Sequence, residues 1–431
     1  MGPPTICDVF AVLKNNPEFR KLWLSQVVSS AGDWFNRMAI LALIGSLGGP
    51  DIGTGLGALF ALEFALRLLP SALFSPLAGA LADRLSRRSV MLITDLLRAA
   101  IVLGFLLVDE SHELPLLYGL LFAQMSVGIF FDAARSASVP NTIAPEDLHT
   151  AYTLSAATWS VMLALGAGLG GLLLTAVGLE GVFLIDSATY LVSAGFVIWL
   201  RLPSTPTPEA PLHWADIFLL RDLRRAIQHL REHQALHFAL AKCFWGACGG
   251  FVVMISIIGK VRFAPLFGAD AAAAGLATSL LYMARGVGTG IGPIFARRFS
   301  GSSDRALLRQ IFTGYFAGAF GYAIFAPLES FPLALAAIVL AHCGGSALWV
   351  ASTTGWQRKI DDSFRGRSFS FEFILVDVSF TLGAIATGAI YDSTGSIEKA
   401  TWITCGAVIA GGITWRALSL RIMANSAPAK G

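Results

Sequence analysis

Residues 79–88, GALADRLSRR, form a short basic loop between two long hydrophobic stretches of the chain. Lysine and arginine in short loops mark the cytoplasmic side of a membrane, because positively charged loops are retained there. Taken alone, the segment predicts two membrane-spanning helices whose connection faces the cytoplasm.

The composition of the whole chain agrees with a membrane protein that crosses the bilayer many times. Of 431 residues, 55% are hydrophobic and 14% are charged, whereas a soluble domain has ~25% charged residues. The mean hydropathy is +0.67. A net charge of +3 is too small to indicate a nucleic-acid partner. Four of the five cysteines lie in apolar stretches, so we expect them to pack there, with no disulfide or metal.

Twelve hydrophobic stretches are long enough to cross ~30 Å of hydrocarbon, six on each side of a polar segment. We therefore predict an all-α polytopic membrane protein with 12 transmembrane helices in two six-helix bundles, residues 1–201 and 236–431. The stretches lie at about 20–47, 54–81, 89–108, 114–138, 151–177, 180–200, 236–259, 271–296, 306–327, 331–353, 367–391 and 397–419.

The polar segment, residues 202–235, is predicted to be a cytoplasmic linker. Its first part is rich in proline, and residues 216–233 have apolar side chains at helical spacing with arginines between them. Such a helix either lies on an anionic membrane surface or is a solvated connection, and both interpretations stay open. His229 and His233 are four residues apart, which alone is weak evidence for a metal site.

Lysine and arginine in the predicted loops fall almost entirely on one side of the membrane. Only Lys260, Arg262 and Lys399 fall on the other side. We therefore expect both termini in the cytoplasm, and a location in the plasma membrane, the inner membrane of a bacterium.

The two halves of the sequence resemble each other. One constant offset places Pro76 on Pro293 and Arg88 on Arg305, and brings Arg67 within one residue of Arg285. A parallel repeat of six helices is typical of a large class of transporters with a substrate site between the halves. Alternating access by rocking of the halves follows from that symmetry.

With this architecture, residues 79–88 resemble the signature of the major facilitator superfamily. The resemblance implies the major facilitator fold, with a latch on the cytoplasmic side. Gly79 would permit close helix approach, Asp83 would bind the positive end of a helix from the other half, and Arg84, Arg87 and Arg88 would meet carboxylates. The equivalent residues 296–305 have Ser300 in place of the aspartate, so we expect the latch to be asymmetric.

Three further segments, 19–35, 139–148 and 365–370, resemble the third drug:proton antiporter family, which includes macrolide exporters and the enterobactin exporter. The last two are predicted to be loops. Residues 166–171 resemble the glycine-rich antiporter signature, with Ala167 where proline is usual. Their small residues would allow tight helix packing near the interface between the halves, through Gly166, Gly168, Gly170 and Gly171.

Each of the first four hydrophobic stretches carries an acid and an arginine one helical turn apart, and each charge costs ~2.5–3.5 kcal/mol at mid-membrane. Asp33/Arg37 and Glu63/Arg67 are predicted near the middle, as candidates for proton coupling or substrate binding. Asp95/Arg98 and Asp132/Arg135 are predicted near the cytoplasmic ends, where charges need not be buried and a gate with Asp83 is favoured. Static pairing at helix seams is the alternative.

The second half contains isolated membrane charges, Lys242, Arg285 and Asp377. Arg285 is expected to meet an anionic group or Asp377, with functional and structural pairing equally open. Phe244 and Trp245 are the best candidates to line a cavity, and Glu372 and His342 are further polar candidates.

Together these features predict a secondary active transporter, with proton-coupled efflux of a hydrophobic or amphipathic small molecule. A lysophospholipid flippase and a siderophore exporter are alternatives within transport, and a membrane receptor is one outside it. The chain contains no GxxxxGK[ST] loop, HExxH motif or nucleophile elbow, so we expect no enzyme activity. We expect no cofactor and no metal, no nucleic-acid partner, contact with membrane lipids, and a monomer.

Overall fold

The computed structural model describes residues 6–48, 55–203, 220–301 and 303–424, and every regular element in these ranges is helical. Each of the predicted hydrophobic stretches contains helix, so the all-α prediction is confirmed. Eight helices of the described part have the length and composition needed to cross a membrane. The linker helix predicted at 216–233 lies partly outside the described residues, and its described part is α9, Leu220–Glu232.

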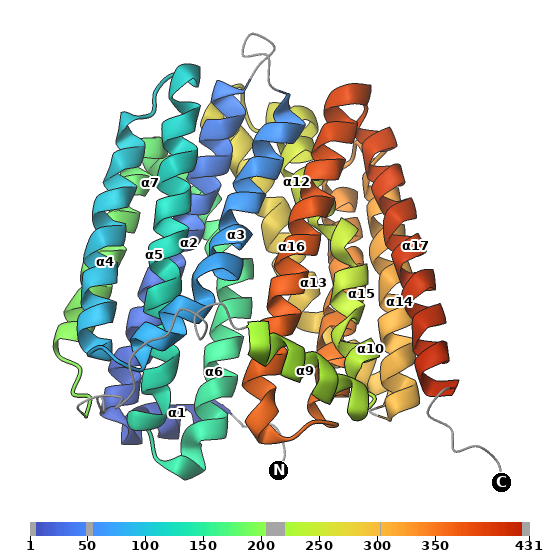
Figure 1. Ribbon diagram of the computed structural model, residues 1–431. Coiled ribbons are helices and arrows are strands. Elements are labelled where there is room, and N and C mark those ends of the chain that lie inside the picture. Colours follow the sequence, from blue (N-terminus) through green and yellow to red (C-terminus); the bar gives the residue numbers. More distant parts are fainter. Residues whose placement is uncertain (1–5, 49–54, 204–219, 302, 425–431) are drawn as a thin grey trace.

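The first half of the chain, called the N half here, is a bundle that follows a short terminal helix, α1 (Figure 1). Its helices are α1 Ile6–Asn15, α2 Pro17–Leu47, α3 Leu56–Ala82, α4 Arg87–Leu103, α5 Leu114–Ser138, α6 Leu148–Val161 and α7 Ala167–Ile198. A π-helical turn, η6 Met162–Gly166, joins α6 to α7, and short 3₁₀ turns lie at Gly104–Leu107, Ser111–Glu113, Val139–Asn141 and Pro145–Asp147.

The second half, called the C half, begins with a broken helix and continues with long ones (Figure 1). The broken helix consists of α10 Leu236–Ala239, α11 Ala241–Phe244, η7 Gly246–Cys248, α12 Gly249–Ile258, η8 Gly259–Phe263 and η9 Ala264–Leu266. The long helices are α13 Ala271–Ser300, α14 Asp304–Phe325, α15 Phe331–Gln357, α16 Asp362–Thr394 and α17 Ile397–Ala424.

One predicted loop is helical in the structure, and one predicted break between helices is found where it was expected. Residues 365–370 were predicted to be a loop, but they lie inside α16, which begins at Asp362, so that prediction is wrong. The fifth and sixth predicted stretches form one helical run that is interrupted at Gly178, where φ is +71° and ψ is −178°. Only glycine adopts this backbone conformation easily, because a Cβ atom would clash with the backbone.

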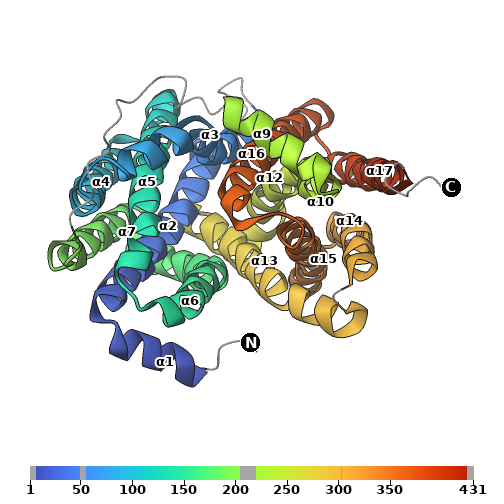
Figure 2. The ribbon, with the colours of Figure 1, turned by 60° about the horizontal axis from the view of Figure 1, so that its bottom comes forward.

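The two halves lie side by side, with α3 next to α16 and with α2 and α7 next to α13 (Figure 2). One end of the molecule carries α1, α9 and the turn between α3 and α4, and we call it the basic face. The other end carries the start of α3 and the end of α16, and we call it the opposite face (Figure 1). The basic face is the side predicted to be cytoplasmic.

The outside of the bundle is apolar, while its inside contains charged groups. Large exposed hydrophobic side chains include Leu73, Ile294 and Leu382. Glu63, Asp95 and other charged side chains are buried instead. This is the reverse of a soluble protein, and it fits a protein whose surface is solvated by lipid. The chain is therefore an integral membrane protein.

Substitution of Gly178 tests the break between the two parts of α7. We expect Gly178→Ala to destabilise the fold by about 1–3 kcal/mol, because the residue must keep a positive φ. The unfolding midpoint in detergent measures this effect. The control is Gly195→Ala in the same helix, where an added Cβ meets no atom within 4 Å. That substitution should be neutral or stabilising by up to about 1 kcal/mol, and equal losses in the two variants would contradict the interpretation.

Candidate functional site

A buried hydrogen-bond chain crosses the N half at Asp33. The Tyr190 hydroxyl of α7 donates to the Asp33 carboxylate of α2. Gln124 of α5 donates to the Tyr190 hydroxyl at 3.0 Å, and Asn36 donates to Gln124 at 3.2 Å. Asp33 is therefore held by partners from other helices of its own half, and the expected pair with Arg37 is not formed.

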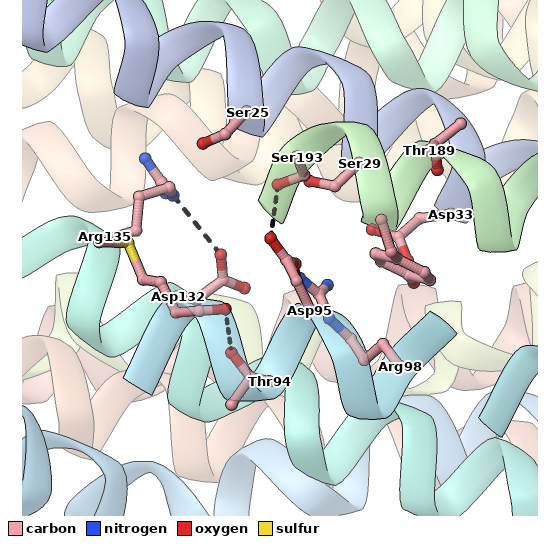
Figure 3. Close-up of polar contacts among 12 residues, drawn as sticks. Ser25, Ser29, Asp33, Thr94, Asp95, Arg98, Asp132, Arg135, Thr189 and Ser193 are labelled. Carbon is pink, nitrogen blue, oxygen red and sulfur yellow. Dashed lines mark hydrogen bonds and ion pairs between the residues drawn. The ribbon is translucent and has the colours of Figure 1, made fainter. Parts of the chain in front are cut away.

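Asp95 and Arg98 of α4 lie in the same region as Asp33 (Figure 3). Arg98 donates to Asp95 at 2.6 Å, and Ser193 of α7 donates to Asp95 at 2.7 Å. The Arg98 guanidinium also lies over the Tyr190 ring, 4.3 Å from its centroid. Asp95 is 0% exposed and Arg98 5%. The expectation that this pair need not be buried is wrong, because α4 packs this face against α7.

Asp186 of α7 belongs to the same acidic group, although the sequence analysis did not select it. Its side chain is fully buried, and Thr189 donates to Oδ1 at 3.4 Å. Its Oδ2 atom has no hydrogen-bond partner among the described residues. An acid within the hydrophobic stretch 180–200 was the available signal, but no arginine follows it one turn later. We call Asp33, Asp95, Asp186, Arg98 and Tyr190 the acidic network.

A second group of charges lies around Glu63 of α3. Arg67 donates to Glu63, and the Nε atom of Arg37 is 3.5 Å from the same carboxylate. Arg37 also donates to the Tyr282 hydroxyl of α13 at 3.4 Å. Arg37 therefore links the N half to the C half, and Glu63 is shared by two arginines.

Arg285 reaches this second group from the C half. Its guanidinium lies 5.6 Å from the centroid of the Tyr282 ring, and that of Arg37 lies 5.1 Å from the same centroid. The expected contact of Arg285 with Asp377 is not found among the described residues, where Nε and Nη1 of Arg285 have no hydrogen-bond partner. We call Arg37, Glu63, Arg67, Arg285 and Tyr282 the basic cluster.

Lys242 of α11 is not isolated, as the sequence suggested, but paired. Its ammonium lies 2.9 Å from Glu372 of α16, and both side chains are 1% exposed. It also donates to Thr353 at 2.6 Å and lies over the Trp349 ring. The pair is therefore a buried link between α11, α15 and α16.

The two aromatic candidates for cavity lining lie next to this pair. Trp245 is 6% exposed and packs edge-on against Phe380 of α16. The backbone of Phe244 lies against Gly411 of α17. Trp245 thus packs inside the C half in this arrangement, and a cavity-lining role for either residue stays a prediction.

The predicted gate residues at the basic face have their partners within the N half. Asp83 is 4.0 Å from Arg87, and 73% of its side chain is exposed. Arg87 donates to the Ala137 carbonyl at 2.7 Å, and Arg88 donates to the Ile198 carbonyl. No hydrogen bond or ion pair joins Asp83 to a described residue of the other half, so the expected capping contact is absent in this arrangement.

Asp132 and Arg135, two further gate candidates, also have their partners within the N half. Asp132 is 3.7 Å from Arg135 and is 69% exposed, while Arg135 also donates to Gln26 of α2 at 3.0 Å (Figure 3). Arg84 is half-buried. A Cβ added at Gly79 would meet no atom within 4 Å, so the expected close helix approach is not seen there.

A capping contact of the predicted kind exists at the opposite face. The Asp392 carboxylate of α16 accepts hydrogen bonds from the backbone amides of Gly57 and Ala58, both at 2.8 Å. An acid at the first turn of α3 satisfies free amide groups and interacts favourably with the helix dipole. The sequence signal was available, since 388–392 (GAIYD) repeats the spacing of 79–83 (GALAD).

The glycines of η6 and α7 lie at two different helix contacts. A Cβ at Gly166 would be 3.0 Å from Trp34, and one at Gly170 would be 3.1 Å from Phe35, so both face α2. Gly168 faces Met283 and Gly171 faces Ser279, both of α13. The second pair therefore lies at the contact between the halves.

At the basic face, outside the membrane-spanning part, Glu18 connects the start of α2 to Arg201, which follows α7. It accepts from the Arg201 amide and from Lys21, both at 2.7 Å. Burial acts to raise the pKa of Glu18, but these two donors outweigh it and hold the pKa below its usual value.

A group able to hold a metal ion lies where the linker helix meets the C half. His229 of α9, His233 just after its end, and Asp361 bring one ligand atom each within 4.8 Å of one another. The sequence showed only the two histidines, because Asp361 is distant in the chain. Two imidazoles and a carboxylate suit a zinc-type ion.

Comparison with known proteins gives both a family and relatives. The family model of the Major Facilitator Superfamily matches residues 22–384. A protein named "Putative bacilysin exporter BacE" from Bacillus amyloliquefaciens is 33% identical over 191 residues, which cover 44% of this chain and 46% of that protein. The match thus spans about half the length of this relative. "Uncharacterized MFS-type transporter Rv0037c" of Mycobacterium tuberculosis is 25% identical over 409 residues, 90% of this chain and 88% of that protein.

Solved structures share the fold at low sequence identity. The nucleoside transporter NupG has a TM-score of 0.66 at 15% identity and covers 92% of this chain and 98% of its own. A bacterial homolog of the human lysosomal transporter Spinster, in an inward-facing and unoccupied conformation, has a TM-score of 0.61 at 15% identity and covers 95% and 96%. These likenesses concern the fold alone. Because the family model matches most of the chain and the helices have the matching arrangement, this protein belongs to the Major Facilitator Superfamily.

Proposed function

We propose that this chain is a secondary active transporter that exports a hydrophobic or amphipathic small molecule by alternating access, in exchange for protons. The superfamily and a relative named as an exporter support transport as the activity. The distribution of lysine and arginine supports cytoplasmic termini in a plasma membrane, the bacterial inner membrane. The outward direction is supported by the relative named as an exporter.

The observation that carries the proton part of the proposal is the charge balance of the acidic network. Three carboxylates, Asp33, Asp95 and Asp186, lie around the guanidinium of Arg98, and Asp33 also interacts with Arg67, so the carboxylates outnumber these arginines. Excess negative charge inside the membrane is costly, and a bound proton removes part of it. Asp33 is the best candidate to exchange that proton, because a neutral hydroxyl is its direct partner.

The contact between α3 and α16 supports alternating access. These helices run antiparallel, so the end of each lies near the start of the other. Asp392, at the end of α16, caps the start of α3, whereas Asp83, at the end of α3, does not cap a described helix of the other half. Rocking of the halves would break the Asp392 cap at the opposite face and allow Asp83 to form a cap at the basic face.

The first test measures coupling in liposomes that contain the purified protein and a pH-sensitive dye. A panel of drugs, siderophores and lysophospholipids is supplied. We expect that transport of at least one compound across the membrane is accompanied by proton movement in the opposite direction. Movement of a compound without any pH change would contradict antiport, and a flippase or uniporter would then be favoured.

Asp33→Asn tests the proton site. Because the amide cannot ionise, we expect proton movement to fall to the level of protein-free liposomes, while binding of the compound and the unfolding midpoint stay near those of the wild type. Asp109→Asn is the control, since Asp109 is exposed between α4 and α5. Full coupling in Asp33→Asn would exclude Asp33 as the proton carrier.

Asp392→Ala tests the cap at the opposite face. Loss of a helix cap costs about 1 kcal/mol, which is about a fivefold change in a two-state equilibrium. Spin labels are placed at Glu110→Cys and Lys399→Cys, which are exposed positions, one in each half. With Asp392→Ala added, we expect a larger fraction of molecules with a long distance between the two labels than without it. Ser393→Ala is the neighbouring control, because Ser393 bonds only within its own helix. An unchanged distance distribution in Asp392→Ala would remove the cap from the mechanism.

Asp83→Asn and Asp132→Asn test the predicted gate at the basic face. Both residues are exposed, so neither substitution should alter the unfolding midpoint. We expect each to lower the transport rate by about twofold to tenfold, as a shift of about 0.5–1.4 kcal/mol between the conformations would do. Wild-type rates in both variants would rule out the gate role.

A further inference from the structure

The basic cluster carries more positive charge than its own residues neutralise. Arg37 and Arg67 share the Glu63 carboxylate, and Arg37 and Arg285 share the Tyr282 ring, so the formal charge of the group is +2. The side chains of Arg37 and Arg67 are 11% and 12% exposed. Asp33 of the acidic network offsets part of this charge at a distance, and an anion in direct contact with the guanidinium groups would stabilise them further.

Unpaired hydrogen-bond donors of the basic cluster also indicate that an anion would bind there. Nε of Arg37, Nη2 of Arg67, and both Nε and Nη1 of Arg285 are buried without a hydrogen-bond partner among the described residues. A buried unsatisfied donor costs about 1–3 kcal/mol, and more when it is charged. These donors come from α2, α3 and α13, and thus from both halves of the protein.

The nearby carboxylates of the described part are already engaged elsewhere. Asp33 accepts from Tyr190, and Glu372 is paired with Lys242. An acceptor for the free donors must therefore come from outside this set.

The aromatic groups of the cluster favour a ligand with an apolar part. The guanidinium groups of Arg37 and Arg285 lie 5.1 Å and 5.6 Å from the Tyr282 ring centroid, which is 6.4 Å from that of Trp34. A guanidinium that lies over a ring keeps its N–H groups directed sideways, where a carboxylate or phosphate can accept two of them.

We propose that Arg37, Arg67 and Arg285 bind the carboxylate or phosphate of an amphipathic substrate, with Trp34 and Tyr282 against its apolar part. This inference rests on the proposed transport function and narrows its substrate class to anions. Because Arg285 comes from the C half and the other two arginines from the N half, rocking of the halves would separate the donors and release the anion.

Binding by the full chain in nanodiscs of neutral lipid tests the proposal, with calorimetry as the readout. The soluble probes are octanoate, octyl phosphate and inorganic phosphate, and lysophosphatidylglycerol represents a lipid source of the same phosphate chemistry. Methyl octanoate and octyltrimethylammonium are the neutral and cationic counterparts. We expect at least one anionic amphiphile to bind, and the ester and the ammonium compound to bind at least about tenfold more weakly.

Arg285→Gln should weaken binding of the anionic amphiphile by about tenfold or more, since one charge-assisted contact is worth about 1.5–3 kcal/mol. Arg285→Lys, which keeps the charge, should restore part of the affinity and excludes a simple folding defect. Arg297→Gln is the matched control, because Arg297 is an exposed arginine of the same helix. Equal affinity of ester and acid, or wild-type affinity in Arg285→Gln, would overturn the proposal.

Transport assays with the same variants separate this inference from the function on which it rests. If the wild type exports a neutral or cationic compound and Arg285→Gln does so equally well, the anion site is wrong while transport stands. If octanoate binds in an Arg285-dependent way but no compound of the panel crosses the membrane, the anion site stands and the transport proposal is wrong.

Discussion

A charged side chain at the middle of a bilayer costs about 2.5–3.5 kcal/mol unless protein or water surrounds it, and the helix arrangement of this chain follows from that constraint. Glu63, Asp95, Lys242 and Glu372 are buried between helices, while Leu73, Ile294 and Leu382 face outward. Each buried charge draws together helices that are distant in sequence. Asp95 joins α4 to α7 through Ser193, and Glu372 joins α16 to α11 through Lys242.

The two charged groups of the N half have opposite excess charge and share one helix. Asp33 of the acidic network and Arg37 of the basic cluster are one turn apart on α2. A movement of α2 relative to α7 or α13 would therefore affect both groups. In the proposed mechanism, this common helix couples a proton at Asp33 to an anion at Arg37, without direct contact between the two ligands.

The fold could be read from the sequence to a large extent, whereas the contacts of the site could not. Hydrophobic length predicted the helices, and the spacing of Pro76 and Pro293 placed both prolines inside equivalent helices, α3 and α13. The acid and arginine of each turn were expected on one helix face, where they could pair with each other or with a neighbouring helix. Arg67 does meet Glu63 and Arg98 does meet Asp95, but Asp33 and Arg37 have other partners. Spacing along a helix gives the shared face, and neighbouring helices then compete for each group.

The sequence by itself determined which residues are charged and which helix carries each of them, because the helices follow from hydrophobic length. Tertiary structure alone decided the partners. Tyr282 and Arg285 reach Arg37 because α13 packs against α2, and Asp392 reaches Gly57 because α16 runs antiparallel to α3. A hydrogen bond depends on distances of about 3 Å across a helix contact, and nothing in the local sequence fixes such a distance.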